Sequence, residues 1–572
     1  MKHALFFILS CVMSFSRIYA SDPTEVPLNS QMYIVGGGII GALESYYAYQ
    51  DALKSGKKIC ITVFEKGESF DRSSQGDSST NTSYNIVPSL TTDEILSVVP
   101  RGSELVEKLA ILFNQPGGIR VDDVEGVNDS TSAVQFKEAV AKYGSDKLHD
   151  DRTLSLLRLG KISMDLWQQM YDEGDAELKA ILETSNFNPC HETTQGSQRT
   201  LHDGYRIDLI YGIVNARQHA LNMQTDYEKI GYKNCAILSP DEAVAIDPYI
   251  EDFCHDHSEL VGNTRVWKKD SIALWRPGGC IDGRTFLPKF YAYLKKIMGK
   301  YEDAQGDLRD CFELKFNSEV IGVDLDSCCN KSRIIGLRFS NGGQLVENRA
   351  QFDCRYVFCP GESVGTLQRL GFNEPAYSAF AGASLMMMIP ISKEDCEKYK
   401  NYSHCMEVHS EGIVLPIQAR VKENSISIGA AGTKAFYGDK APHKNEEFAT
   451  NRNLVQLNMV NNVLPEFMSL AFGYCTHGKT LSAEELSFLE NQGIVQRWVG
   501  RRAVAFDGFP TIGALYSDAR RVTNARCTTH LGSGGVSFGP GAVFISRSSE
   551  SNIEDLFIQK ILKYADSRRL AE

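Results

Sequence analysis

Short apolar runs alternate with longer segments of mixed polarity along this 572-residue chain. The runs "MYIV" (32–35) and "KICITVF" (58–64) are typical of strands that are buried on both faces of a parallel sheet. Between them, "ALESYYAYQDALKS" (42–55) contains neither proline nor glycine and predicts a helix. The runs "ASLMMMIPI" (383–391) and "NSISIGAAG" (424–432) predict strands of a second, largely antiparallel sheet. Together these elements predict a mixed α/β protein.

The first 20 residues, "MKHALFFILSCVMSFSRIYA", have the form of a secretory signal peptide. Lys2 precedes an apolar stretch, and Ala20 comes directly before the polar segment "SDPTEVPLNS". We therefore expect cleavage after Ala20 and an exported, periplasmic or secreted protein; the alternative is an uncleaved N-terminus that anchors the chain to a membrane. No later segment approaches the roughly 20 apolar residues that span a bilayer.

The charge balance and the cysteine spacing exclude some classes of protein. Lysine and arginine number 60 against 72 acidic residues, which gives a net charge of −12, and no dense basic tract is present. This balance argues against a nucleic-acid partner, including an RNA substrate. The 15 cysteines contain no C-x-x-C pair and no metal-type spacing, so we expect them to be small apolar core residues.

The pattern Gly36-x-Gly38-x-x-Gly41 joins the first predicted strand to the first predicted helix. Gly36 permits a tight turn, Gly38 lets the backbone approach a pyrophosphate at the helix N-terminus, and Gly41 allows helix and strand to pack closely. Glu65 ends the second strand, 24 residues after Gly41, where its carboxylate can accept hydrogen bonds from an adenosine ribose. The unit predicts a dinucleotide site, and by itself it fits FAD and NAD equally.

A second glycine-rich segment, "CTTHLGSGGVSFGPGAVFIS" (527–546), leads into a helical run that begins near Gly541. Backbone amides at the start of such a helix stabilise negative charge that develops on the pyrimidine end of a reduced flavin. An NAD enzyme has no need of a second glycine loop near its C-terminus. The pair of glycine segments therefore favours FAD.

With these two segments the chain resembles the D-amino-acid oxidase superfamily of FAD enzymes, which includes glycine oxidase, sarcosine oxidase and D-amino-acid dehydrogenase. Six further segments carry the resemblance: "RSSQGDSSTNTSYNIVPS" (72–89), "LSPDEAVAIDPYI" (238–250), "WRPGGCIDGRTFLPKF" (275–290), "NSEVIGVDLD" (317–326), "YVFCPGESVGTLQRLG" (356–371) and "WVGRRAVAFDGFPTIG" (498–513). The last is similar to the Trp-Ala-Gly-x-Arg-Pro…Asp-Gly-x-Pro-x-Ile-Gly of glycine-oxidase-like members, with Ala503 in place of the proline. In all, the resemblance extends over about residues 31–550.

The resemblance implies a discontinuous domain organisation. It implies a Rossmann-like FAD-binding domain formed by residues 31–115, 281–370 and 494–555. A mixed, largely antiparallel substrate-binding domain is inserted between these segments and comprises residues 200–280 and 371–493. Residues 116–199 are expected to be a helical elaboration.

The resemblance also implies where FAD binds. No cysteine stands at residues 500–503, where sarcosine-oxidase-like members tether flavin, so FAD is expected to bind noncovalently. The expected cofactor-binding residues, from the glycine pattern and the resemblance together, are Gly36, Gly38, Gly41, Glu65, Ser79, Asn81, Val320, Gly361, Gly532, Gly534, Gly535 and Val536. No metal site is expected.

Arg502 and His530 are the candidate catalytic residues. Arg501 and Arg502 are adjacent on a predicted strand and point to opposite faces, so only one of them can enter a pocket. The resemblance places Arg502 on the arginine that grips a substrate carboxylate, since a guanidinium matches a carboxylate with two hydrogen bonds. His530 opens the terminal glycine loop, either as a catalytic group or as a residue that caps or packs. Trp275 and Arg276 either line the pocket entrance or form a cation–π pair on the surface.

The function that the resemblance implies is oxidation of the C–N bond of an amino acid, with hydride transfer from Cα to flavin N5. With a D-amino acid or glycine, the imine product hydrolyses to a 2-oxo acid and ammonia. An N-methyl amino acid needs the same carboxylate clamp and is the alternative substrate; a flavin-binding protein without turnover is the alternative outside this class. The electron acceptor is oxygen or a quinone at the membrane surface.

Overall fold

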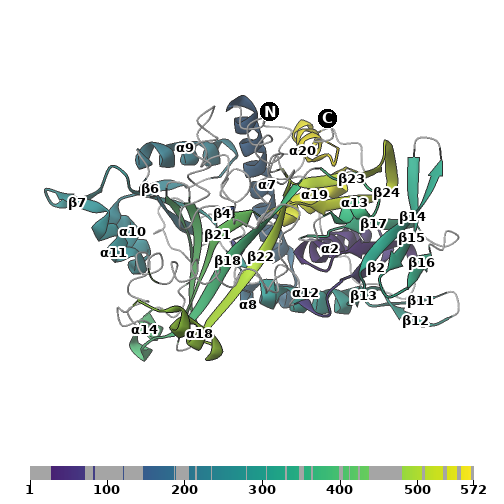
Figure 1. Ribbon diagram of the computed structural model, residues 1–572, viewed down its shortest axis with the longest axis horizontal. Coiled ribbons are helices and arrows are strands. Elements are labelled where there is room, and N and C mark those ends of the chain that lie inside the picture. Colours follow the sequence, from purple (N-terminus) through teal and green to yellow (C-terminus); the bar gives the residue numbers. More distant parts are fainter. Residues whose placement is uncertain are drawn as a thin grey trace.

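The described chain forms two large sheets that lie side by side, with helix α7 (Asp146–Glu173) between them (Figure 1). The computed structural model describes residues 28–70, 82–83, 120–121, 146–185, 187, 205–210, 212, 215–232, 235–278, 280–281, 283–303, 306–328, 331–346, 353–361, 365–375, 377–398, 403–410, 413–422, 425–436, 461, 480–505, 509–531, 538–549 and 555–568. The predicted signal peptide, Ser79, Asn81 and the loop 532–537 lie outside these ranges.

The first sheet is built around parallel strands. From one edge to the other they are β13 (Phe312–Lys315), β2 (Lys58–Phe64), β1 (Leu28–Val35), β17 (Asp353–Phe358), β24 (Arg520–Thr529), β15 (Lys331–Phe339) and β14 (Val320–Cys328). Neighbours from β13 to β15 pair in parallel, and β14 pairs antiparallel with β15. Two further strands, β16 (Gln344–Val346) and β23 (Thr511–Ser517), pair antiparallel with β15 and β24.

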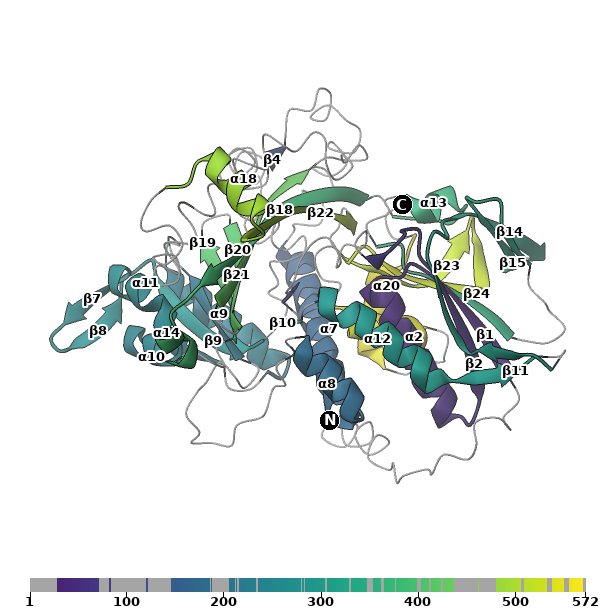
Figure 2. The ribbon, with the colours of Figure 1, turned by 90° about the horizontal axis from the view of Figure 1, so that it is seen from below.

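Both faces of this sheet are covered, which explains the uninterrupted apolar runs of its central strands. Met32 and Ile34 of β1 join a buried cluster on one face, and Tyr33 and Val35 join a second cluster on the other. The helices that contribute to the first cluster include α7 as well as α2 (Ile39–Lys54), α12 (Gly283–Met298), α19 (Gly539–Ser548) and α20 (Leu556–Ala565). Figure 2 shows α2 and α12 side by side, next to α8 (Ala176–Thr184). The second cluster is closed by β14, β15 and the short helix α13 (Thr366–Arg369).

The second sheet is mixed and largely antiparallel. Its strands in order are β22 (Val495–Ala505), β18 (Tyr377–Pro390), β21 (Ser425–Phe436), β20 (Ile413–Lys422), β19 (Ser403–Ser410), β5 (Tyr205–Ile210), β9 (Ile272–Pro277) and β6 (Ala236–Leu238). Only the β5–β19 pair and the addition of β4 (Arg120–Val121) to β21 are parallel among the described strands of this sheet. The predicted strands 383–391 and 424–432 lie in β18 and β21, which pair with each other. The mixed α/β class predicted from the sequence is therefore confirmed.

Shorter elements surround the two sheets. Helix α9 (Ala216–Lys229) packs over β5 and β9. Toward the β6 end of the sheet lie α10 (Pro240–Ile246), η4 (Pro248–Ile250), α11 (Glu251–Asp256), β7 (Ser258–Val261) and β8 (Thr264–Trp267). The remainder are α14 (Lys393–Lys398), α18 (Ala483–Asn491), the pair β3 (Thr82–Ser83) and β10 (Cys280–Ile281), and the hairpin β11 (Lys300–Glu302) and β12 (Leu308–Asp310). Within the described part of the chain, every helix is too short or too polar to cross a membrane.

Trp275 and Arg276 occupy a different environment from the one expected. On β9 they are 2% and 0% exposed, so neither lines a pocket entrance nor forms a surface pair. Arg276 Nε donates to the carboxylate of Asp208 on the neighbouring strand β5, and its guanidinium carbon lies 5.1 Å from the ring centroid of Tyr227. A buried arginine needs such a carboxylate, because an isolated charge in the core is prohibitively costly. The sequence expectation for this pair was wrong because the carboxylate comes from a strand 68 residues earlier.

The expectation of buried cysteines is confirmed for seven of the eight whose side chains the structure describes. Cys60, Cys235, Cys254, Cys311, Cys354, Cys359 and Cys527 are buried, and Cys396 is partly exposed. Most of them belong to the apolar clusters of the two faces of the first sheet. Burial in apolar surroundings is common for free cysteines.

Candidate functional site

Gly36 turns the chain out of β1 beneath the end of β17. Its backbone has φ +111°, and a Cβ placed there would lie 2.1 Å from the carbonyl oxygen of Cys359. Cys359 follows β17, which pairs in parallel with β1, so the two strand ends meet at this point. Gly41 is equally constrained, because its Cβ would lie 2.1 Å from the carbonyl oxygen of Gly36. Both positions therefore exclude every side chain.

Helix α2 begins at this turn with its N-terminal amides uncapped. Gly38 is the residue before the helix and has an extended backbone (φ −76°, ψ −169°). Because it is a glycine, it has no side chain that could cap the first amides of the helix. No acidic residue stands in the first turn of α2. The first N–H groups of a helix have no acceptor within the helix, and together with the helix dipole they favour an anion. The uncapped amides and the helix dipole at this end of α2 therefore favour binding of a phosphate group.

Glu65 lies beside the turn, at the end of β2, and is only 7% exposed. Its Oε2 accepts a hydrogen bond from the backbone N–H of Gly37 (2.8 Å), and its Oε1 accepts one from Gly67 (2.9 Å). The carboxylate thereby holds the glycine turn in place. Each carboxylate oxygen can accept a further bond, so these contacts leave room for a ribose hydroxyl.

Val320 and Gly361 lie at the same edge of the sheet. The backbone N–H of Ser318 donates to the carbonyl oxygen of Glu65 (2.9 Å), which brings the start of β14 and Val320 next to the acidic residue. Gly361 follows Cys359 by two residues and has φ +57°, a conformation that favours glycine. The structure thus gathers the described candidate cofactor residues at the carboxyl ends of β1, β2 and β17. This edge is where open parallel sheets bind their ligands.

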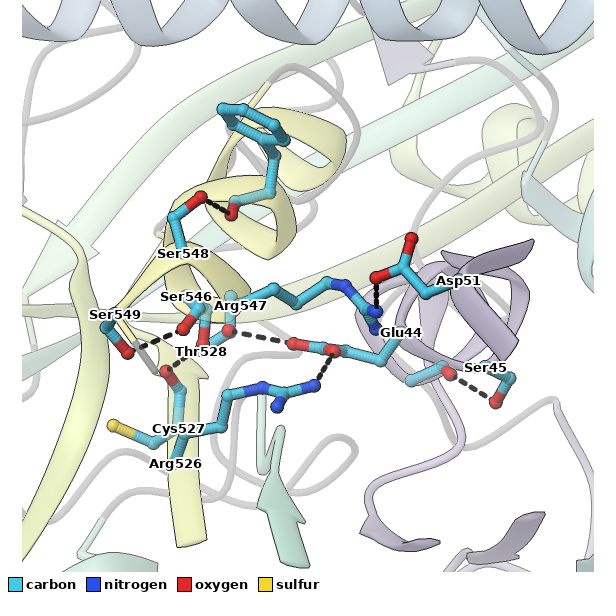
Figure 3. Close-up of polar contacts among 12 residues, drawn as sticks. Glu44, Ser45, Asp51, Arg526, Cys527, Thr528, Ser546, Arg547, Ser548 and Ser549 are labelled. Carbon is cyan, nitrogen blue, oxygen red and sulfur yellow. Dashed lines mark hydrogen bonds and ion pairs between the residues drawn. The ribbon is translucent and has the colours of Figure 1, made fainter. Parts of the chain in front are cut away.

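A buried ion pair joins α2 to β24 directly behind the turn (Figure 3). Arg526 Nη2 lies 2.8 Å from Glu44 Oε2, with the two side chains 3% and 0% exposed. Thr528 Oγ1 donates to Glu44 Oε1 (3.4 Å). Strand β24 leads into the loop 532–537, so the pair couples the phosphate-binding helix to the strand that carries the second glycine segment.

Both ends of that loop are anchored in the described part of the site. On one side, α19 starts at Gly539, where a Cβ would lie 3.1 Å from the Cδ1 atoms of Ile40 and Leu43 on α2. The predicted start of this helix, near Gly541, is thus confirmed to within two residues. On the other side stands His530. The candidate residues Gly532, Gly534, Gly535 and Val536 lie between these anchors, outside the described residues.

His530 is held by protein groups on both ring nitrogens. Its Nδ1 lies 2.8 Å from Thr511 Oγ1, and its Nε2 lies 3.0 Å from Glu374 Oε1; both His530 and Glu374 are buried. The other oxygen of Glu374 accepts from the backbone N–H of Gln368 (2.9 Å). A catalytic role for His530 would require one of these contacts to break, whereas a positioning role uses them as they stand.

Arg502 lies near the end of β22, which runs toward the first sheet in Figure 1. In the register of the sheet, Arg502 stands opposite Phe380 and Arg501 opposite Ala381 on β18. Only eight residues separate Arg502 from Thr511, the partner of His530. At no more than about 3.5 Å per residue, this connection keeps Arg502 within roughly 30 Å of Thr511.

Three residues of this site were not predicted from the sequence: Glu44, Arg526 and Glu374. Glu44 follows apolar residues within a predicted helix, and nothing in the local pattern distinguishes a buried carboxylate from a solvated one. Its partner is 482 residues away, beyond the reach of any periodicity argument. The sequence contains only a weak sign of this buried ion pair: Arg526 is a charged residue in a strand that is buried along most of its length.

Replacing Gly36 by alanine is expected to lower the free energy of unfolding by about 3 kcal/mol and to abolish binding of a dinucleotide. The new methyl group would collide with a backbone carbonyl, which cannot move without separating β17 from β1. Gly56→Ala is the matched control, because Gly56 also has positive φ (+62°) but no atom within 4 Å of its Cβ position. This control should lose only about 1 kcal/mol in a urea titration. Equal losses for the two variants would contradict the close approach at Gly36.

No protein-family model and no curated protein matches this chain. Solved structures do match it along nearly its whole length. Amadoriase I of Aspergillus fumigatus, a fructosyl amine:oxygen oxidoreductase, is 9% identical with a TM-score of 0.51, covering 95% of this chain and 90% of its own. L-proline dehydrogenase of P. horikoshii is 14% identical (TM-score 0.49; 96% and 99% covered), and glycine oxidase of Geobacillus kaustophilus is 14% identical (TM-score 0.44; 92% and 97% covered). The match to Amadoriase I shows a shared fold along nearly the whole chain.

Proposed function

We propose that this protein is an FAD-dependent oxidoreductase that oxidises the C–N bond of an amino acid, either a D-amino acid or glycine. In this proposal the first sheet with α2, α12 and α19 is a Rossmann-like FAD-binding domain, and the second sheet forms the inserted substrate-binding domain. FAD binds without a covalent link. The amino-acid and amine oxidoreductases that share the fold support this class of chemistry.

The observation that carries the proposal is the uncapped start of α2. Its free amides stand beside a turn in which Gly36 and Gly41 exclude side chains, and beside the buried carboxylate of Glu65. A pyrophosphate needs the first feature, and an adenosine ribose needs the last. These residues fit the adenosine diphosphate half of FAD, with Val320 and Gly361 at the same edge.

Bound FAD would supply the two-electron acceptor for the reaction. Arg502 binds the substrate carboxylate through two hydrogen bonds and thereby fixes the orientation of Cα. The substrate amine must be neutral when its C–N bond is oxidised, and its proton leaves to water or to a backbone carbonyl. Glu374 and Thr511 hold His530 just before the second glycine segment.

The test is reduction of the bound flavin in the absence of oxygen. Purified protein is mixed anaerobically with glycine and with separate pools of D-amino acids, L-amino acids and N-methyl amino acids, and the visible flavin absorbance is followed. Bleaching by the D-amino acid or glycine pool supports the proposal, and bleaching by the N-methyl pool alone assigns the sarcosine-like reaction instead. If FAD is bound and no pool bleaches it, the amino-acid reaction is excluded and a protein without turnover is favoured. Admitting air or a quinone afterwards identifies the electron acceptor.

A further inference from the structure

Cys60 and Cys311 lie side by side on neighbouring strands, although they are far apart in the sequence. Strands β2 and β13 pair in parallel with Ile61 opposite Phe312, and the backbone N–H of Ile61 donates to the carbonyl oxygen of Cys311 (2.8 Å). One position earlier in the same register, Cys60 stands opposite Cys311. Opposite residues on paired strands direct their side chains to the same face. The two thiols accordingly hydrogen-bond to each other.

A solvent-connected cavity reaches both thiols. The side chains are only 4% and 1% exposed, but both line a cavity of about 830 Å³. Lys295 and Arg309 also line this cavity, and their side chains are 63% and 59% exposed. A small oxidant can therefore enter this cavity from solvent, past charged side chains.

The two thiols are not equivalent. The hydrogen bond from Cys60 lowers the pKa of Cys311, and the ammonium group of Lys58 lowers it further. The same hydrogen bond, together with burial, raises the pKa of Cys60. Cys311 is therefore the better nucleophile at neutral pH, and Cys60 keeps its proton.

We propose that Cys60 and Cys311 form a redox pair that a hydroperoxide converts into a disulfide joining β2 to β13. The Cys311 sulfur attacks the O–O bond of the peroxide, which gives a sulfenic acid and releases water or an alcohol. The Cys60 sulfur then attacks the sulfenic sulfur, forming the S–S bond and releasing a second molecule of water. The two sulfurs together lose two electrons and two protons, and the peroxide gains them.

Backbone geometry permits this bond. Paired strands lie about 4.8 Å apart, which falls within the range of Cα separations that a disulfide spans. The backbone hydrogen bonds of Cys311, from Ile61 N–H to its carbonyl oxygen and from its N–H to the carbonyl oxygen of Gly299, hold it beside β2. The reaction requires neither flavin nor an amino-acid substrate, and it stands independently of the function proposed above.

The test is peptide mapping of the full-length protein after peroxide treatment. The reduced protein is exposed to hydrogen peroxide, alkylated and digested, and disulfide-linked peptides are identified by mass spectrometry. We expect one linked pair that contains Cys60 and Cys311, two fewer thiols titrated in denaturant, and complete reversal by a thiol reductant. The unsubstituted protein gives this result, so no variant has to fold for the test to be decisive.

Variants then assign the two roles. Cys60→Ser should leave a sulfenic acid on Cys311 that a dimedone probe traps, and Cys311→Ser should slow reaction at this pair by about tenfold or more. Cys254→Ser is the matched control, because Cys254 is a buried thiol in the other part of the molecule, and it should leave the Cys60–Cys311 link unchanged. The proposal is overturned if both cysteines stay alkylated while other thiols oxidise, or if either of them links to a different cysteine.

Discussion

Replacing Arg502 by methionine is expected to lower kcat/KM by about 10³-fold, or about 4 kcal/mol of transition-state stabilisation, for the substrate that bleaches the flavin. The proposed role of Arg502 is to hold the substrate carboxylate with two charge-assisted hydrogen bonds, and methionine preserves the length of the side chain without the charge. The loss should appear in both kcat and KM, because the arginine binds the carboxylate and also orients Cα. Steady-state kinetics of the two proteins measures this difference.

Arg501→Met is the matched control for this prediction. Arg501 is the preceding residue on the same strand, β22, and adjacent residues of a strand alternate between the two faces of a sheet. We expect its kcat/KM to remain within about threefold of the unsubstituted protein, since a change at the other face leaves the carboxylate clamp intact. Flavin content should be the same in both variants. A large loss for Arg501→Met with little loss for Arg502→Met would reverse the assignment of the two faces.

Glu44→Gln is expected to lower the free energy of unfolding by about 3–5 kcal/mol. The substitution removes the negative charge from a pair in which both side chains are almost fully buried, and it leaves the guanidinium of Arg526 in the core without its carboxylate. Because the pair joins α2 to β24, affinity for FAD should fall together with stability. Urea unfolding followed by circular dichroism, and flavin retention on a desalting column, measure the two effects.

An exposed ion pair on the same helix provides the comparison. Asp51 of α2 pairs with Arg547 of α19 (Figure 3), but the Asp51 side chain is 60% exposed. Asp51→Asn should therefore cost no more than about 1 kcal/mol. Replacing both members of the buried pair by methionine should recover much of the loss seen for Glu44→Gln, since no unpaired charge remains. A Glu44→Gln variant as stable as Asp51→Asn would show that the buried pair contributes little.

Local features determined much of the dinucleotide unit. The apolar runs of β1 and β2, the glycine turn and the unbroken helical segment of α2 were all predicted from residues 31–65, and the structure contains each of them. This succeeded because a turn that excludes side chains and a helix that must not be interrupted constrain residue types directly. Strands β18 and β21 were predicted from their apolar runs, and the start of α19 from the glycine-rich segment before it.

Tertiary structure decided which of the remaining polar residues are buried and with which partners. Arg276 was expected at a surface or an entrance, and it lies in the core because Asp208 of the adjacent strand neutralises it. Glu44 finds Arg526, His530 finds Glu374, and Cys60 finds Cys311 only after the order of strands is set. A sequence pattern shows only whether a residue and its near neighbours along the chain prefer water or the protein core. The partner that reverses this preference for a charged residue comes from a distant segment, so only the folded chain reveals it.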